Sequence, residues 1–289
     1  LHPVAHSFPT RRSSDLYADG TTPKPLIHVQ NAAGGQPITV QPDLIHMDCA
    51  PDQDGFLVVF GTGQHIGTTD FDDTSVQTFY GVWDWQASWP ETEQAGKYLG
   101  DFTATASAPS LSNAPSSADS LTLLEQTATD SGSDWRTFSD NAISYFDAPD
   151  GDGDSLTDHA GWFFNLKDTR ARVIRDPDIR AGTGEDVGIV TFISSVPSNS
   201  PCSAGGNSWL YQVSVCNGGQ ADQPQFDTNA DEQVDASDDV TKSGKSFQEM
   251  LYTPSQLEDK LYIPDSKANI NTEAIQFAGE GVVYWRKIQ

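Results

Sequence analysis

Short runs of apolar and aromatic residues, separated by turn-rich stretches, dominate the chain. The clearest runs are 55–61 (GFLVVFG), 78–85 (TFYGVWDW) and 187–194 (VGIVTFIS), each compact and bounded by turn residues, as buried strands are. Residues 208–215 (SWLYQVSV) alternate large apolar and polar positions, the period-two pattern of a half-buried strand. No segment longer than about ten residues has the periodicity of a helix. The pattern predicts an all-β chain.

Shorter segments complete this pattern. Further strands are expected at residues 38–44, 121–129, 135–145, 161–165, 172–174 and 281–288, and residues 104–120 are of low complexity and predict a loop. A long Gly- and Asp-rich loop separates the runs at 55–61 and 78–85. Two strands joined by a long loop are typical of neighbouring strands within a β-propeller blade.

Charge narrows the classes of partner. The 289 residues carry 41 acidic and 16 basic side chains, a formal net charge of -25. Such a surface repels nucleic acid and anionic membranes, because both bind proteins through Lys and Arg. Clustered carboxylates suit hard cations such as Ca²⁺, although net negative charge also serves solubility alone.

The strongest chemical signal is an acidic loop at residues 227–238 (DTNADEQVDASD). Counted from its first residue, oxygen-bearing side chains recur at the positions that ligate Ca²⁺ in an EF-hand-type loop, and the seventh residue offers its backbone carbonyl. The candidate ligands are Asp227, Asn229, Asp231, Gln233, Asp235 and Asp238. Glu232 stands where Gly normally permits the sharp turn. A solvated acidic loop is the alternative.

A second acidic stretch, residues 150–158 (DGDGDSLTD), repeats part of this spacing. Its candidate ligands are Asp150, Asp152, Asp154 and Asp158, but Gly161 occupies the place of the bidentate carboxylate. Any Ca²⁺ bound here would be held more weakly or completed from elsewhere in the chain. A flexible acidic insertion is the alternative.

Three cysteines allow at most one disulfide bond. A strand-like run lies between Cys202 and Cys216 and would span roughly 20 Å if extended. These two can pair only if the Gly205-Gly206 loop doubles back, because bridged Cα atoms lie within about 7 Å of each other. The sequence leaves this pairing open.

Catalytic and membrane motifs are missing from the sequence. Residues 61–67 (GTGQHIG) have GxGxxxG spacing without a following helix pattern, which predicts a tight turn and not a nucleotide site. The six histidines form no paired zinc spacing, and no GxSxG or Cys-His signature occurs. No apolar run reaches the roughly 18 residues that span a bilayer. We expect a protein that is not an enzyme and has no transmembrane segment.

The first residues are set apart from the rest. Residues 7–16 (SFPTRRSSDL) match one reading frame of a widely used sequencing adapter. We therefore interpret residues 1–16 as adapter-derived and expect residues 17–289 to form one domain.

Four stretches together resemble the C-terminal β-propeller region of PilY/PilC-type proteins of type IV pili. They are LVVFGTGQHIGTTDFDDTSVQTFYGVWD (57–84), GWFFNLKDTRARVIRDPDIR (161–180), SSVPSNSPCSAGGNSWLYQVSVCNGG (194–219) and FDTNADEQVDASDDV (226–240). LLEQT (123–127) and YWRKI (284–288) fit as well. The family motif FGTG-(K/R)-Y departs here, because His65-Ile66 replaces the usual aromatic residue.

This resemblance implies a fold, a place and a role. The fold would be an all-β, quinoprotein-like β-propeller, partial because its N-terminal blades are missing. The protein would be exported to the periplasm and outer membrane, the pilus tip or the cell surface. It would bind Ca²⁺ and act in pilus biogenesis, retraction control and adhesion. Its partners would be minor pilins, the tip complex, and host or abiotic surfaces.

Two other functions stay open. A quinone-dependent dehydrogenase would share the propeller, but it needs a Trp stacked on the cofactor over Ca²⁺ and often a vicinal Cys pair, and no two cysteines here are adjacent. A surface carbohydrate-binding module is the second alternative, since the strands are rich in Trp. Trp residues in β proteins usually lie in the core, however.

Overall fold

The computed structural model describes residues 17–19, 22–50, 55–84, 99–112, 121–145, 158–182, 186–198 and 205–276. In these ranges the chain forms strands and one short 3-10 helix, η1. The elements are β1 (Tyr17–Asp19), β2 (Thr22–Lys24), β3 (His28–Asn31), β4 (Gly34–Gly35), β5 (Asp43–His46), β6 (Phe56–Gly61), η1 (Thr68–Phe71), β7 (Thr78–Asp84), β8 (Asp101–Thr103), β9 (Leu121–Glu125), β10 (Ala128–Ser131), β11 (Trp135–Phe138), β12 (Asp158–Asn165), β13 (Asp178–Ala181), β14 (Gly188–Pro197), β15 (Gly206–Ser214), β16 (Lys242–Phe247), β17 (Ser255–Leu257), β18 (Lys260–Pro264) and β19 (Ile270–Ala274).

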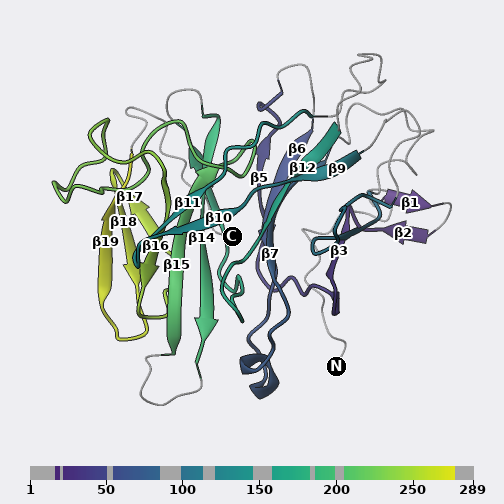
Figure 1. The fold of residues 1–289 in the computed structure, drawn as a ribbon, viewed down its shortest axis with the longest axis horizontal. Helices are drawn as coiled ribbons and strands as arrows, with labels where there is room; N and C mark the ends of the chain where they lie inside the picture. Colours follow the sequence, from purple (N-terminus) through teal and green to yellow (C-terminus); the bar gives the residue numbers. More distant parts are fainter. Residues whose placement is uncertain are drawn as a thin grey trace, which may run out of the picture.

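The strands form separate sheets that stand side by side (Figure 1). The two largest have the strand orders β5-β6-β7-β12-β9 and β10-β11-β16-β15-β14-β13. Smaller sheets, β4-β3-β8 and β17-β18-β19, lie on either side of this pair, and β1 pairs with β2. Separate sheets stacked face to face are the blade arrangement of a propeller.

Aromatic side chains fill the space between the two large sheets. Phe79 of β7 stacks on Phe192 of β14 with ring centroids 3.9 Å apart, and Phe164 of β12 lies 5.5 Å from Phe192. Trp162 is fully buried in the same cluster. Complete burial of such a side chain stabilises the fold by about 2–3 kcal/mol. The apolar runs of the sequence therefore become the faces on which neighbouring blades pack.

A second core cluster joins the six-stranded sheet to the small sheet β17-β18-β19. Ile193 and Leu210 face Leu261 and Ile263 across it. Because β15 is covered on both faces, almost all of its residues are buried. The prediction of a half-buried strand at residues 208–215 was therefore wrong. Alternate side chains of this strand point to opposite faces of the sheet, and each face packs against a different core cluster.

Most other strand predictions are confirmed, with shifts at the boundaries. The runs at 55–61, 78–85 and 187–194 form β6, β7 and β14, and β6 pairs antiparallel with β7 as neighbouring strands of one blade. The strand expected at 38–44 forms later, as β5. Only β11 forms in the expected strand pair at 135–145, since Tyr145 makes an isolated bridge.

Pairing is mainly antiparallel, with two exceptions. β9 pairs parallel with β12, and β3 pairs parallel with β8. Across the described ranges, no helix is long and apolar enough to cross a membrane. Residues 1–16, which we interpret from their sequence as adapter-derived, and the strand expected at 281–288 lie outside those ranges.

Candidate metal centre

The acidic loop lies in the connection from β15 to β16, between two buried anchors. On its N-terminal side Phe226 is fully buried and meets the ring of Trp135 edge-on at 5.6 Å. At its other end Asp238 is 8% exposed. The loop is therefore held at both ends by the body of the fold, while the acidic residues between them are exposed or half-buried.

The carboxylate of Asp227 organises the first turn of the loop. Its Oδ1 accepts the backbone N–H of Ala230 at 2.6 Å and of Asp231 at 3.3 Å. Its Oδ2 accepts the N–H of Glu232 at 2.8 Å. Three consecutive amides thus wrap around one carboxylate, which bends the chain inward.

The next candidate ligands repeat one local contact. The side-chain oxygen of Asn229 accepts the N–H of Asp231 at 3.0 Å, and that of Asp231 accepts the N–H of Gln233 at 3.0 Å. In the same way, the side-chain oxygen of Asp235 accepts the N–H of Ser237 at 2.7 Å. These Asx-type turns wind the loop tightly.

Asp238 closes the loop on itself. Its Oδ1 accepts the N–H of Thr228 at 2.7 Å, and its Oδ2 accepts the N–H of Asp235 at 3.0 Å. The hydroxyl of Thr228 also contacts Oδ1 at 3.1 Å. The first and last candidate ligands are therefore brought to the same end of the loop.

Glu232 adopts the conformation that Gly would have at this position. Its φ is 68°, in the left-handed region, and Ala230 has a φ of 65°. A side chain in this region costs on the order of 1–2 kcal/mol. The missing Gly therefore does not prevent the sharp turn; the loop forms it at a cost in strain.

Hydrogen bonds favour the ionised form of the carboxylates at the loop's end. The backbone N–H and the side chain of Ser237 lower the pKa of Asp235. Hydrogen bonds from Thr241, with Lys242 nearby, lower the pKa of Asp239. These groups are charged at neutral pH, as ligands of Ca²⁺ must be.

The residues fit a hard cation by the chemistry of their donors. The loop offers carboxylate and amide oxygens, and each keeps lone pairs beyond those used in the hydrogen bonds above. In the ranges that the structure describes, no three His, Cys, Asp or Glu side chains are grouped closely enough to hold a metal ion. Binding would therefore require the free oxygens of these carboxylates to turn toward a shared point.

The second acidic stretch is described only at its end. Asp150, Asp152 and Asp154 lie outside the described residues, whereas Asp158 is the first residue of β12 and is 6% exposed. Its backbone pairs with Leu121 of β9. Asp158 is thus part of the sheet, and it is the one candidate ligand of this stretch that the described ranges include.

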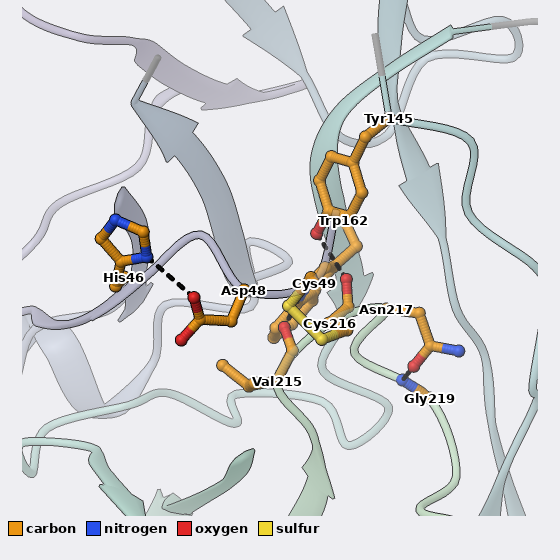
Figure 2. The surroundings of a disulfide bond; sticks show 9 residues. All are labelled: His46, Asp48, Cys49, Tyr145, Trp162, Val215, Cys216, Asn217 and Gly219. Carbon is orange, nitrogen blue, oxygen red and sulfur yellow. Dashed lines mark hydrogen bonds and ion pairs between the residues drawn. A yellow bond between two sulfur atoms is a disulfide. The ribbon is translucent and has the colours of Figure 1, made fainter. Parts of the chain in front are cut away.

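A disulfide bond that the sequence did not predict joins Cys49 to Cys216, with a Cα–Cα distance of 5.3 Å (Figure 2). Cys216 is therefore not the partner of Cys202, which lies outside the described residues. The indole N–H of Trp162 donates to the carbonyl of Val215 at 2.7 Å and fixes the backbone beside this bond. No spacing rule could have found a pair 167 residues apart.

Two other sequence interpretations can be compared with the structure. The tight turn predicted at the GTGQHIG stretch is wrong: the chain leaves β6, makes an isolated bridge from Gly63 to Ile38 and leads without a turn into η1. Trp83, Trp162 and Trp209 are all buried, and Trp135 is half-buried and packs on Phe226. The described Trp residues thus belong to cores and give no platform for a sugar.

Three comparisons with known proteins agree with one another. A family model, the PilY1 beta-propeller domain, matches residues 9–97. The type IV pilus biogenesis factors PilY1 of Pseudomonas aeruginosa strains PAO1 and PAK are each 27% identical over 219 residues, which is 74% of this chain and 17% of theirs. The PilY1 homolog of Xylella fastidiosa is 26% identical over 71% of this chain and 12% of its own length.

The fold agrees as well. The crystal structure of the Pseudomonas aeruginosa PilY1 C-terminal domain has a TM-score of 0.59, with 22% identity, over 87% of this chain and 48% of that one. This match confirms the all-β, propeller-type fold expected from the sequence. The chain spans 17% of the length of the Pseudomonas relatives. The sequence motifs, the family match and the fold therefore all show similarity to the C-terminal β-propeller region of PilY-type proteins.

Proposed function

We propose that this chain is the Ca²⁺-binding propeller part of a pilus-associated protein that acts in type IV pilus biogenesis, retraction control and adhesion. The names of its relatives, type IV pilus biogenesis factors, support the first of these roles. The protein would be exported and would work with minor pilins and the tip complex at the pilus tip or cell surface. Host or abiotic surfaces would be its adhesion targets.

The geometry of the acidic loop supports the Ca²⁺ part of the proposal most directly. Candidate ligands stand at EF-hand spacing, and Glu232 supplies the left-handed turn in the position that Gly takes in such loops. When bound, Ca²⁺ would neutralise the mutual repulsion of the four loop aspartates. Phe226 and Asp238 anchor the loop in the fold, so ordering of the loop would stiffen the β15–β16 connection.

A role without catalysis fits these observations better than the alternatives. A quinone-dependent dehydrogenase often has a vicinal Cys pair, whereas Cys49 and Cys216 are bonded across 167 residues. The hypothesis of a carbohydrate-binding module was based on the Trp-rich strands. Trp83, Trp162 and Trp209 are buried, so these three side chains cannot stack on a sugar. Neither alternative gains a specific observation from the structure.

A chimera tests the proposed function in cells. In a Pseudomonas aeruginosa strain without its own PilY1, the matching C-terminal segment would be replaced by residues 17–289 of this chain. We expect surface piliation and twitching to be restored, and their dependence on Ca²⁺ to disappear with Asp227→Ala plus Asp231→Ala. The matched control, Asp72→Ala plus Glu258→Ala, removes the same charge from exposed positions elsewhere. A chimera that is exported at normal level but leaves the cells without pili would contradict the proposal.

A further inference from the structure

β10 is the edge strand of the six-stranded sheet. It pairs with β11 on one side, with Ala128 opposite Phe138 and Asp130 opposite Arg136. The N–H of Ser139 donates to the carbonyl of Thr127 at 2.9 Å, which makes these two a hydrogen-bonded pair of the same ladder. Hydrogen-bonded pairs alternate along an antiparallel ladder, so Thr129 and Ser131 also point toward β11.

The backbone groups of Ala128 and Asp130 therefore point away from the sheet. Within the described ranges, nothing hydrogen-bonds to these outward N–H and C=O groups. Such a row of open groups is a template for another strand. Two other edge strands of the large sheets each receive a hydrogen bond from a neighbouring segment: Asp43 accepts the N–H of Ile179 in β13, and the N–H of Leu111 donates to the carbonyl of Leu121 in β9.

A cavity of about 470 Å³ runs beside this open edge. Small or apolar residues from four different parts of the chain line it: Val76, Ala104, Ala128 and Leu166. The chain from Glu125 to Ala128 lines the cavity, so the cavity lies where the chain passes from β9 in one large sheet to β10 in the other. A strand laid along β10 would place every second side chain into this space.

Charge at the rim selects among possible strands. Lys167 and Glu125 both line the cavity. Lys167 is neutralised by Asp130 at 2.6 Å, whereas the exposed carboxylate of Glu125 has no ion-pair partner in the described part of the chain. A basic residue on the incoming segment would complement Glu125, and the net charge of -25 favours a basic partner in general.

We propose that β10 accepts an extended segment of a partner protein as an added antiparallel strand. This segment would carry small apolar residues at alternate positions and a Lys or Arg at the end that reaches Glu125. Main-chain hydrogen bonds to Ala128 and Asp130 would supply affinity, and the cavity would select the side chains. The proposal is independent of Ca²⁺ binding.

The test uses the full chain and a synthetic peptide, acetyl-TVTVK-amide. In an antiparallel strand its lysine falls beside Glu125. Amide NMR spectra should show the peptide shifting the signals of Ala128 and Asp130. Ala128→Pro removes an outward N–H without touching the bonds to β11, and edge strands tolerate Pro there. We expect it to weaken binding about tenfold.

A second variant keeps the proposal testable if the Pro variant does not fold. Wild type should prefer acetyl-TVTVK-amide over acetyl-TVTVE-amide, and Glu125→Gln should remove that preference. Three results would overturn the proposal. They are no shift at Ala128 and Asp130, equal binding of both peptides by wild type, or binding only after residues 277–289 are deleted. The last would show that the chain's own end occupies the site.

Discussion

The sulfur atoms of Cys49 and Cys216 are bonded at 2.08 Å although 167 residues separate them in sequence. Cys49 follows β5 in the five-stranded sheet, and Cys216 follows β15 in the six-stranded sheet. The bond therefore ties one blade to the next and closes a long loop of chain. Closing a loop of this length removes much of the entropy of the unfolded chain.

Loss of this bond should destabilise the domain. We expect Cys49→Ser with Cys216→Ser to lower the free energy of unfolding by about 3–5 kcal/mol, measured by urea titration. Peptide mapping without reductant should recover the segments around Cys49 and Cys216 as one linked species. A linked Cys202–Cys216 species would contradict the structure.

Two glycines with similar backbone angles should respond differently to the same change. Gly218 has a φ of 70°, and a Cβ added there would lie 2.1 Å from the ring of Trp162. Gly132 has a φ of 78°, with nothing within 4 Å of the added atom. We expect Gly132→Ala to cost about 1 kcal/mol and Gly218→Ala at least about 3 kcal/mol in urea unfolding. Equal costs would show that Trp162 does not pack against this turn.

Sequence reasoning found the blades because each apolar run is local. β6, β7 and β14 are compact runs between turn residues, and period or run length is enough to place them. The burial of β15 on both faces was missed, because alternation gives no sign of what covers the second face. The disulfide was missed for a related reason: Cys49 and Cys216 meet only through the stacking of whole sheets.

The six candidate ligands lie within one short segment, so their spacing in the sequence already describes the loop, and their binding of Ca²⁺ stays a prediction. The conformation of Glu232 was not predictable, because a non-Gly residue takes a positive φ only when the contacts around it require one. The amides gathered by Asp227 are such contacts.

Stability should fall in mild acid through His159. This residue of β12 is half-buried, and burial lowers the pKa of its imidazole, against a hydrogen bond to Ser144 that raises it. Because the folded pKa lies below the unfolded value of about 6.5, the unfolded chain binds the proton first as pH drops. His159→Gln should therefore reduce the loss of unfolding free energy between about pH 7.5 and pH 5. The control is His46→Gln at an exposed histidine. If wild type, His159→Gln and His46→Gln all lose the same unfolding free energy over this pH range, His159 is excluded as the cause.

The strained backbone of Glu232 offers a second test of Ca²⁺ binding by the loop. Glu232→Gly should relieve the left-handed backbone and raise Ca²⁺ affinity by up to about fivefold, because Gly adopts this φ without penalty. Glu232→Ala removes the same charge but keeps the strain, and it should leave the affinity nearer to that of wild type. Calorimetric titration of both variants separates the two effects. An unchanged or lower affinity for the Gly variant would contradict the assignment of Glu232 to the turn position.

Acid should also release any bound Ca²⁺. The lowered pKa values of Asp235 and Asp239 mean that their stabilising ionised forms persist at neutral pH. As pH falls below about 4 and through the folded pKa values of these two carboxylates, both become protonated. Protonation removes their negative charge and weakens the hydrogen bonds that they accept within the loop. Ca²⁺-dependent gains in thermal stability at neutral pH should therefore vanish in acid. Mg²⁺ should substitute poorly, since it demands stricter octahedral geometry.

Calorimetric titration with Ca²⁺ tests the central claim most directly. Wild type and the control Asp72→Ala with Glu258→Ala should bind one ion at the loop with similar affinity. Asp227→Ala with Asp231→Ala should lose that ion, because it removes the carboxylate that gathers the first turn and one further ligand. If the double variant instead binds Ca²⁺ with the affinity and stoichiometry of wild type, the loop at residues 227–238 is not the site. If wild type binds no Ca²⁺, the loop is a solvated acidic surface.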